Sequence, residues 1–228
     1  MNRREFLKVA GMGAVTVFLS GCGVLGTTGT GESSQAAKAV APQTISKGNK
    51  LKILVITGSA HAQGTSAHLA DRFIQGAMEA GHNVTRFNSA FEKYHLCTGC
   101  NQCGGDGPCV FKDAIEEKLM PSLLEADVVA LITPLYYYGF SAQIKSVIDR
   151  FYARNNNPKL KGKNALLMAT AYNSSADTMP ALVKHYQAIL KILNWKDAGQ
   201  VLAIGCGARS LIEKSPFAGQ AYEIGKKM

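Results

Sequence analysis

Residues 51–66 read LKILVITGSAHAQGTS and place a strand signal directly before the start of a helix. The run from Leu51 to Thr57 is short, apolar and rich in β-branched side chains, and it ends at Gly58. Near-continuous apolarity of this kind is typical of a parallel strand that is covered on both faces. The stretch therefore predicts an α/β fold in which a loop leaves the carboxyl end of a strand and enters a helix.

The same strand pattern recurs along the rest of the chain. Further strands are expected at 82–87, 127–133, 164–171 and 199–204. Apolar residues at helical spacing lie between them, including the sets Leu69, Phe73, Ala77; Ile144, Val147, Phe151; and Leu182, Tyr186, Leu193. Five strands alternating with helices predict a doubly wound, five-stranded parallel sheet with helices on both faces.

Two prolines and two polar residues refine the expected helix ends. Asp177 or Thr178 is expected to cap the helix that follows, with Pro180 in its first turn. Pro121 is expected to kink or stop the helix that precedes residue 127.

The loop after the first strand has the chemistry of a phosphate site. Ser59, Thr65 and Ser66 offer three hydroxyl groups, and the backbone N–H groups of the helix start lie beside them. The loop lacks the Walker lysine pattern and the full glycine fingerprint of dinucleotide-binding folds, so ATP and Rossmann-type NAD binding are poorly supported. The alternative is that Thr65 or Ser66 only caps the helix.

Four of the chain's six cysteines, Cys97, Cys100, Cys103 and Cys109, fall within thirteen residues. This density predicts a redox or metal site, because cysteines three apart can direct their sulfurs to one centre. A 4Fe-4S cluster, a zinc ion, and a loop of reduced or disulfide-paired cysteines all remain open. We expect the loop to follow the second strand at the carboxyl side of the sheet.

The N-terminus has the pattern of an export signal. Arg3 and Arg4 precede a short apolar run that ends in Leu19-Ser20-Gly21-Cys22. We expect residues 1–21 to be a twin-arginine signal peptide, Cys22 to carry a lipid, and residues 22–49 to form a flexible tether. The alternative is a cytosolic amphipathic tail.

Residues 50–228 are long enough for one domain with a substantial core. The formal net charge of the whole chain is +9, but its basic side chains are scattered and form no stripe interleaved with aromatic residues. This pattern argues against nucleic-acid binding and is compatible with attraction to anionic lipid or to cofactor phosphates.

The segment Pro134-Leu135-Tyr136-Tyr137-Tyr138-Gly139 is a second candidate for ligand contact. Pro134 is expected to end a buried strand, and the loop after it lies beside the first loop at the switch point where doubly wound sheets bind ligands. One or two of the tyrosines are expected to touch a planar ring. Tyr172, Asn173 and Ser174 are a weaker candidate for the edge of that ring.

The isolated histidines and the last cysteine are assigned no function. The histidines fall at no ligand spacing and are expected to be ordinary surface or satisfied residues; they are His68, His82, His95 and His185. Cys206, alone after the last strand, is expected to be buried apolar filler.

Together these motifs resemble the flavodoxin-like NAD(P)H-dependent FMN reductases and, among them, the iron-sulfur flavoproteins. The resemblance implies that FMN is the cofactor, that the first loop binds its phosphate and that the tyrosine segment lies against the isoalloxazine. The implied cofactor residues are Ser59, His61, Gly64, Thr65, Ser66, Pro134, Leu135, Tyr136, Tyr137, Tyr138 and Gly139. The chain departs from the family at His61, where arginine is frequent, and at Thr65, where asparagine is frequent. Relatives with this cysteine spacing occur with and without a 4Fe-4S cluster.

The expected function is therefore that of an FMN-dependent oxidoreductase that passes electrons through the bound flavin. The family's donor is NAD(P)H, which is scarce outside the cytoplasm, so a quinone or a membrane partner is an alternative donor for an exported, membrane-anchored form. The other readings are an electron-transfer module without turnover and a cysteine-rich lipoprotein that binds zinc. A homo-oligomer is compatible with the sequence.

Overall fold

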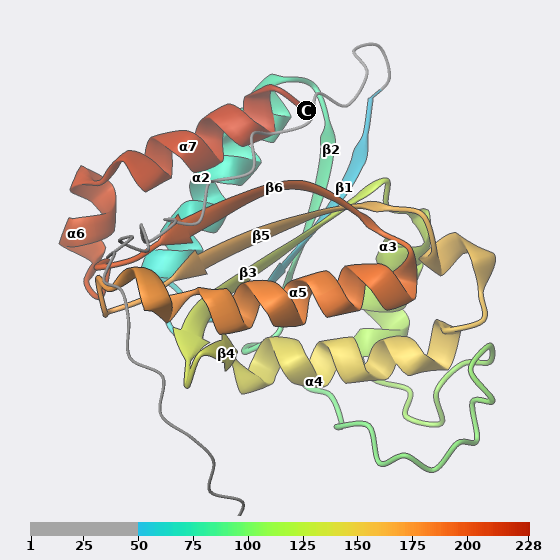
Figure 1. The fold of residues 1–228 in the computed structure, drawn as a ribbon. Coiled ribbons are helices and arrows are strands. Elements are labelled where there is room, and N and C mark those ends of the chain that lie inside the picture. The colour runs from blue at the N-terminus through green and yellow to red at the C-terminus, as the bar shows by residue number, and fades with distance from the viewer. Residues whose placement is uncertain (1–49) are drawn as a thin grey trace, which may run out of the picture. The chain divides into compact units, whose positions relative to one another are not determined.

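The computed structural model describes residues 50–228, which form a parallel sheet with helices on both faces (Figure 1). The expected signal peptide, Cys22 and the expected tether lie outside the described residues. The strands of the sheet are β1 (Lys52–Thr57), β2 (Asn83–Asn88), β3 (Val128–Tyr136), β5 (Asn164–Thr170) and β6 (Lys196–Ala203). They run in the order β2-β1-β3-β5-β6, and each neighbouring pair is parallel. The predicted flavodoxin-like fold is confirmed.

The helices divide between the two faces of the sheet (Figure 1). One face is covered by α2 (Thr65–Glu79), α6 (Arg209–Lys214) and α7 (Pro216–Lys226). The other is covered by α3 (Met120–Glu125), α4 (Ala142–Arg150) and α5 (Pro180–Leu193). None of the helices within residues 50–228 combines the length and the apolar character needed to cross a membrane.

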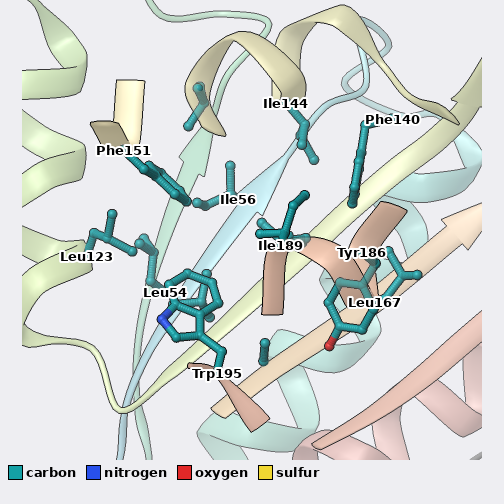
Figure 2. Packing of buried hydrophobic residues seen from close by; sticks show 14 of the residues in the cluster. Leu54, Ile56, Leu123, Phe140, Ile144, Phe151, Leu167, Tyr186, Ile189 and Trp195 are labelled. Carbon is teal, nitrogen blue, oxygen red and sulfur yellow. The ribbon is translucent and has the colours of Figure 1, made fainter. Parts of the chain in front are cut away.

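Side chains of β1 alternate between two separate cores. Leu54 and Ile56 pack with α3, α4 and α5, whereas Ile53 and Val55 pack with α2 and α7. Figure 2 shows the first of these cores, where Trp195 also donates a hydrogen bond from its Nε1 to the carbonyl oxygen of Leu160, 2.6 Å away. Burial on both faces explains why the sequences of β1, β3 and β5 are nearly continuously apolar instead of alternating.

Several predicted element ends are wrong. Pro134 does not end its strand, because β3 continues to Tyr136 and turns back into a two-residue antiparallel strand, β4 (Gly139–Phe140). The last strand begins at Lys196, before the expected residue 199. The small additional strand is an extension of the same sheet and leaves the five parallel strands unchanged.

The helix-end predictions are only partly confirmed. Pro180 does lie in the first turn of α5, but the N-cap is Met179, and Thr178 belongs to a preceding 3-10 turn, Ala176–Thr178. Pro121 does not stop the helix before residue 127. It sits in the first turn of α3, directly after a π-helical turn at Ile115–Leu119, where the missing proline N–H costs little.

A buried ion pair fixes the long segment between β2 and the π-helical turn. Arg150, at the end of α4, is 1% exposed and contacts the carboxylate of Asp113 at 3.0 Å. Burial alone would raise the pKa of Asp113, but the hydrogen bonds from Arg150 and from the His95 N–H outweigh it and hold the pKa below its usual value. The carboxylate is therefore charged at neutral pH, and its contribution to stability is lost only as the pH falls through that lowered pKa.

We predict that Asp113→Asn lowers the free energy of unfolding by about 3–5 kcal/mol, because it leaves the buried Arg150 guanidinium without its counter-charge. Urea unfolding followed by circular dichroism measures the change. The control is Asp149→Asn, which removes an exposed ion pair with Lys145 and should cost about 0.5 kcal/mol or less. Equal small losses in both variants would contradict the anchoring role of Asp113.

Candidate functional site

The carboxyl ends of the central strands surround a cavity of about 440 Å³. Its walls come from the loop after β1, the start of α2, the end of β3 and the loops after β5 and β6. The residues that line it are Ser59, His61, Gly64, Thr65, Ser66, Pro134, Leu135, Tyr136, Thr170, Ala171, Tyr172, Cys206, Gly207 and Arg209. This volume lies within the range of about 300–1,000 Å³ that is usual for small-molecule sites.

The loop after β1 is held in a compact turn by its own atoms. The buried hydroxyl of Ser59 accepts a hydrogen bond from the His61 N–H and donates one to the His61 carbonyl, both at 3.1 Å. The N–H of Gly64 donates to the same carbonyl at 3.0 Å. These contacts bring Ser59 and His61 to the first turn of α2.

Gly58 lets β1 reach this edge against α4. Ser141, the N-cap residue of α4, donates a hydrogen bond from its hydroxyl to the carbonyl of Gly58 at 2.9 Å. A Cβ at position 58 would lie 2.4 Å from that hydroxyl oxygen and 2.7 Å from Ile144. A larger residue would therefore push the loop away from its position.

The start of α2 favours an anion and faces the cavity. Gly64 is its N-cap, no side chain caps the helix, and its first turn contains no acidic residue. Thr65 does not cap the helix: its hydroxyl is 3.0 Å from the hydroxyl of Thr170 on β5. The helix therefore presents backbone N–H groups and the positive end of its dipole to the cavity.

A positively charged side chain that the sequence analysis did not identify also lines the cavity. Arg209, the first residue of α6, lines the cavity and donates a hydrogen bond from Nη1 to the carbonyl of Gln63 at 3.2 Å. Its Nε is 2.6 Å from a carboxylate oxygen of Glu213. The pKa of the nearby His68 is lowered, mainly by burial and to a lesser extent by the positive charge of Arg209. The His68 ring is therefore neutral at pH 7. Arg209 follows the last strand closely, which was the available signal.

Only part of the tyrosine segment lines the cavity. Pro134, Leu135 and Tyr136 are in its wall, whereas Tyr137 and Tyr138 form the exposed turn between β3 and β4. Both turn residues have left-handed backbone conformations, with φ of 46° and 61°. Tyr137 is fully exposed, and neither side chain reaches the cavity lining.

Tyr172 joins the cavity from the loop after β5, while Asn173 and Ser174 are absent from its lining. The Tyr172 ring lies against the backbone of Gly207, where an added Cβ would be 2.3 Å from the ring. Cys206 beside it is 4% exposed, and burial raises the pKa of its thiol, which is therefore neutral at pH 7. Cys206 thus forms part of the cavity wall as well as packing in the core.

The cysteine loop forms a second, smaller hollow. Cys97, Cys100, Cys103 and Cys109 all line it, together with Phe111, Arg150 and Tyr152. All four cysteines are free thiols, and no group of three or more metal-ligating side chains is assembled within residues 50–228. The N–H of Gln102 and the hydroxyl of Thr98 lower the pKa of the exposed Cys100 thiol.

The cysteine loop follows β2 as expected, but its expected position at the carboxyl side of the sheet is wrong. Its hydrogen bonds are with residues that follow α4, including Arg154 to the carbonyl of Gly107 and the N–H of Asn156 to the carbonyl of Gly105. The loop after β2 runs back along α4, so the cysteines lie at the far end of that helix from the cavity (Figure 1).

Comparison with known proteins identifies relatives of the whole sheet region. The model of the NADPH-dependent FMN reductase family matches residues 51–208. An iron-sulfur flavoprotein of Archaeoglobus fulgidus is 34% identical over 113 residues, which are 50% of this chain and 51% of the relative. Another, from Methanocaldococcus jannaschii, is 28% identical over 56% of this chain and 67% of its own length. The chain thus spans about half the length of the first of these relatives.

Solved structures share the fold. An NAD(P)H:quinone oxidoreductase from Methanothermobacter marburgensis superposes with a TM-score of 0.62 at 17% identity, over 78% of this chain and 96% of the other. An azoreductase from Bacillus anthracis gives 0.61 at 18% identity, over 78% of this chain and all of the other. Because the family match covers most of the chain, including every strand of the sheet, this protein belongs to the NADPH-dependent FMN reductase family.

Proposed function

We propose that this protein is an FMN-dependent oxidoreductase that binds the flavin in the cavity at the carboxyl edge of the sheet. The observation that carries the proposal is the uncapped start of α2, which faces the cavity together with the buried Ser59 hydroxyl and Arg209. An anionic phosphate satisfies the free N–H groups and the positive end of the helix at once. The cavity's volume and its mixed aromatic and polar lining also suit a nucleotide with a planar ring.

Each part of the lining has a distinct task in this proposal. The hydroxyls of Ser59 and Thr65 and the N–H groups of the α2 start would bind the phosphate, with Arg209 supplying positive charge. Tyr136 and Tyr172 would contact the ring, and the backbone around Pro134 and Leu135 would orient it. Bound FMN would supply the hydride and electron chemistry.

The titratable side chains that line the cavity within residues 50–228 are His61, Tyr136, Tyr172, Cys206 and Arg209, and the proposal assigns none of them to proton transfer. The chain's contribution would therefore be binding, orientation and the electrostatic setting of the ring. NAD(P)H is the donor that the family suggests. A quinone or a redox protein is the alternative donor if the mature protein is held outside the cytoplasm.

We predict that Arg209→Gln weakens FMN binding about tenfold and leaves riboflavin binding unchanged. One charge-assisted hydrogen bond is worth about 1.5–3 kcal/mol, and partial exposure of Arg209 places the effect at the lower end. Quenching of flavin fluorescence during titration of the apoprotein measures both affinities.

The control for this prediction is Lys214→Gln, which removes the same charge from the other end of α6, outside the cavity lining. It should leave both affinities as they are. Equal weakening of FMN and riboflavin by Arg209→Gln would place Arg209 away from the phosphate.

We also propose that Cys97, Cys100, Cys103 and Cys109 hold a 4Fe-4S cluster. Two observations support this: the four thiols line one hollow, and matched relatives are named iron-sulfur flavoproteins. Four thiolates are the donor set of such clusters. A zinc site and a reduced or disulfide-bonded loop are the alternatives.

Anaerobically purified protein is predicted to contain about four irons per chain, and Cys100→Ala to lose most of them. Iron and zinc analysis with visible absorbance provides the measurement. Cys206→Ala is the matched control and should retain the iron, because Cys206 lines the other cavity. The positive control is a known cluster protein prepared in the same way. If that control loads fully and the wild-type protein contains no iron, the four cysteines bind zinc or act as thiols instead of holding a cluster.

A third proposal concerns residues outside the described structure: Arg3 and Arg4 direct export, and Cys22 anchors the mature chain by a lipid. Lysine at both arginine positions should retain the precursor in the cytoplasm. Cys22→Ala should move the mature protein from the membrane fraction to the soluble fraction, as judged by fractionation and immunoblotting. Membrane association that survives the Cys22 substitution would exclude the lipid anchor.

A further inference from the structure

The guanidinium of Arg150 is buried at the cysteine hollow with one donor unused. Its Nη1 donates to the carbonyl of His95 at 2.8 Å and to Asp113 at 3.0 Å. Its Nη2 is 3.3 Å from both the carbonyl of Phe111 and the other carboxylate oxygen of Asp113. The Nε–H, although buried, has no partner within the described residues.

An unused donor of this kind is costly. Leaving a buried hydrogen-bond donor unsatisfied destabilises the folded state, and it does so more strongly when the group is charged. Within residues 50–228 the other buried side-chain atoms without partners are His82 Nε2, Glu116 Oε1 and Thr178 Oγ1. Arg150 Nε is therefore the guanidinium atom among them, and Arg150 lines the hollow with all four clustered cysteines.

The surroundings of Arg150 leave the hollow as the place for a further acceptor. Asp113 is already occupied by both Nη atoms, and the His95 ring stacks on Phe111 at 4.5 Å between centroids. The Phe111 ring lies 5.8 Å from the guanidinium carbon. The four cysteines supply the sulfur acceptors of the hollow, and its other lining residues are Thr98, Gly99, Asn101, Val110, Tyr152 and Ala153.

We propose that the Nε–H of Arg150 donates a hydrogen bond to a sulfur atom of the metal centre held by these cysteines. The proposal rests on the 4Fe-4S cluster of the proposed function. Hydrogen bonds to cluster sulfurs change the reduction potential. One-electron reduction adds a negative charge to the centre, so a fixed cationic donor stabilises the reduced state and raises the potential.

Arg154 provides a matched comparison. It also holds the cysteine loop, through the carbonyl of Gly107 and an ion pair with Glu116 at 2.7 Å, but it does not line the hollow. None of its side-chain nitrogens is among the buried atoms without partners. Arg150 and Arg154 both anchor the loop, but only Arg150 has a buried side-chain donor without a partner among the described residues.

The test uses the full-length chain, loaded with iron and sulfide under anaerobic conditions, and a redox titration followed by electron paramagnetic resonance. Arg150→Lys keeps a positive charge beside Asp113 but removes the Nε–H, so the cluster's midpoint potential should fall. Arg154→Lys should leave the potential at the wild-type value. Equal potentials for wild type and Arg150→Lys at equal iron content would overturn the proposal.

A second measurement decides the case in which Arg150→Lys fails to fold or to hold iron. Wild-type protein labelled with ¹⁵N-arginine, with its cluster reduced, should show a nitrogen coupling in pulsed electron paramagnetic resonance that persists in Arg154→Lys. Absence of that coupling would refute the hydrogen bond. Iron content of the wild type separately tests the cluster itself: protein that binds no iron overturns both proposals, and iron without the coupling overturns only this one.

Discussion

The positive start of α2 at the carboxyl end of β1 is the feature on which the rest of the site depends. In a parallel sheet covered on both faces, the connections leave at the ends of the strands. The loops after β1, β3, β5 and β6 therefore meet at the carboxyl ends of the strands. The N–H groups of α2 are left without a side-chain cap there. Gly58, pressed against Ser141, holds the loop close enough for Ser59 to join them.

The helix α4 connects this edge to the cysteine loop. Its N-cap residue, Ser141, donates to the carbonyl of Gly58, and its last residue, Arg150, forms the buried ion pair with Asp113. With nine residues and a rise of about 1.5 Å per residue, α4 separates the two regions by about 14 Å. The cavity and the cysteine hollow share no lining residue and are therefore distinct sites.

Elements with continuous apolar patterns were predictable from sequence, and those that depend on contacts distant in sequence were not. The five parallel strands, Pro180 and the loop from Ser59 to Ser66 follow from local composition. Pro134 was misplaced because tertiary pairing with β4 extends β3 beyond it. Arg209 meets the first loop through Gln63, which lies 146 residues away in sequence, and the cysteine loop runs along α4, so both placements depend on tertiary contacts.

A crystal structure of the protein with FMN would test the central claim most directly. The account predicts that the phosphate lies within hydrogen-bond distance of the backbone N–H groups of Thr65 and Ser66, facing Arg209, with the ring against Tyr136. A phosphate bound away from the start of α2, or a flavin seated in the cysteine hollow, would contradict it.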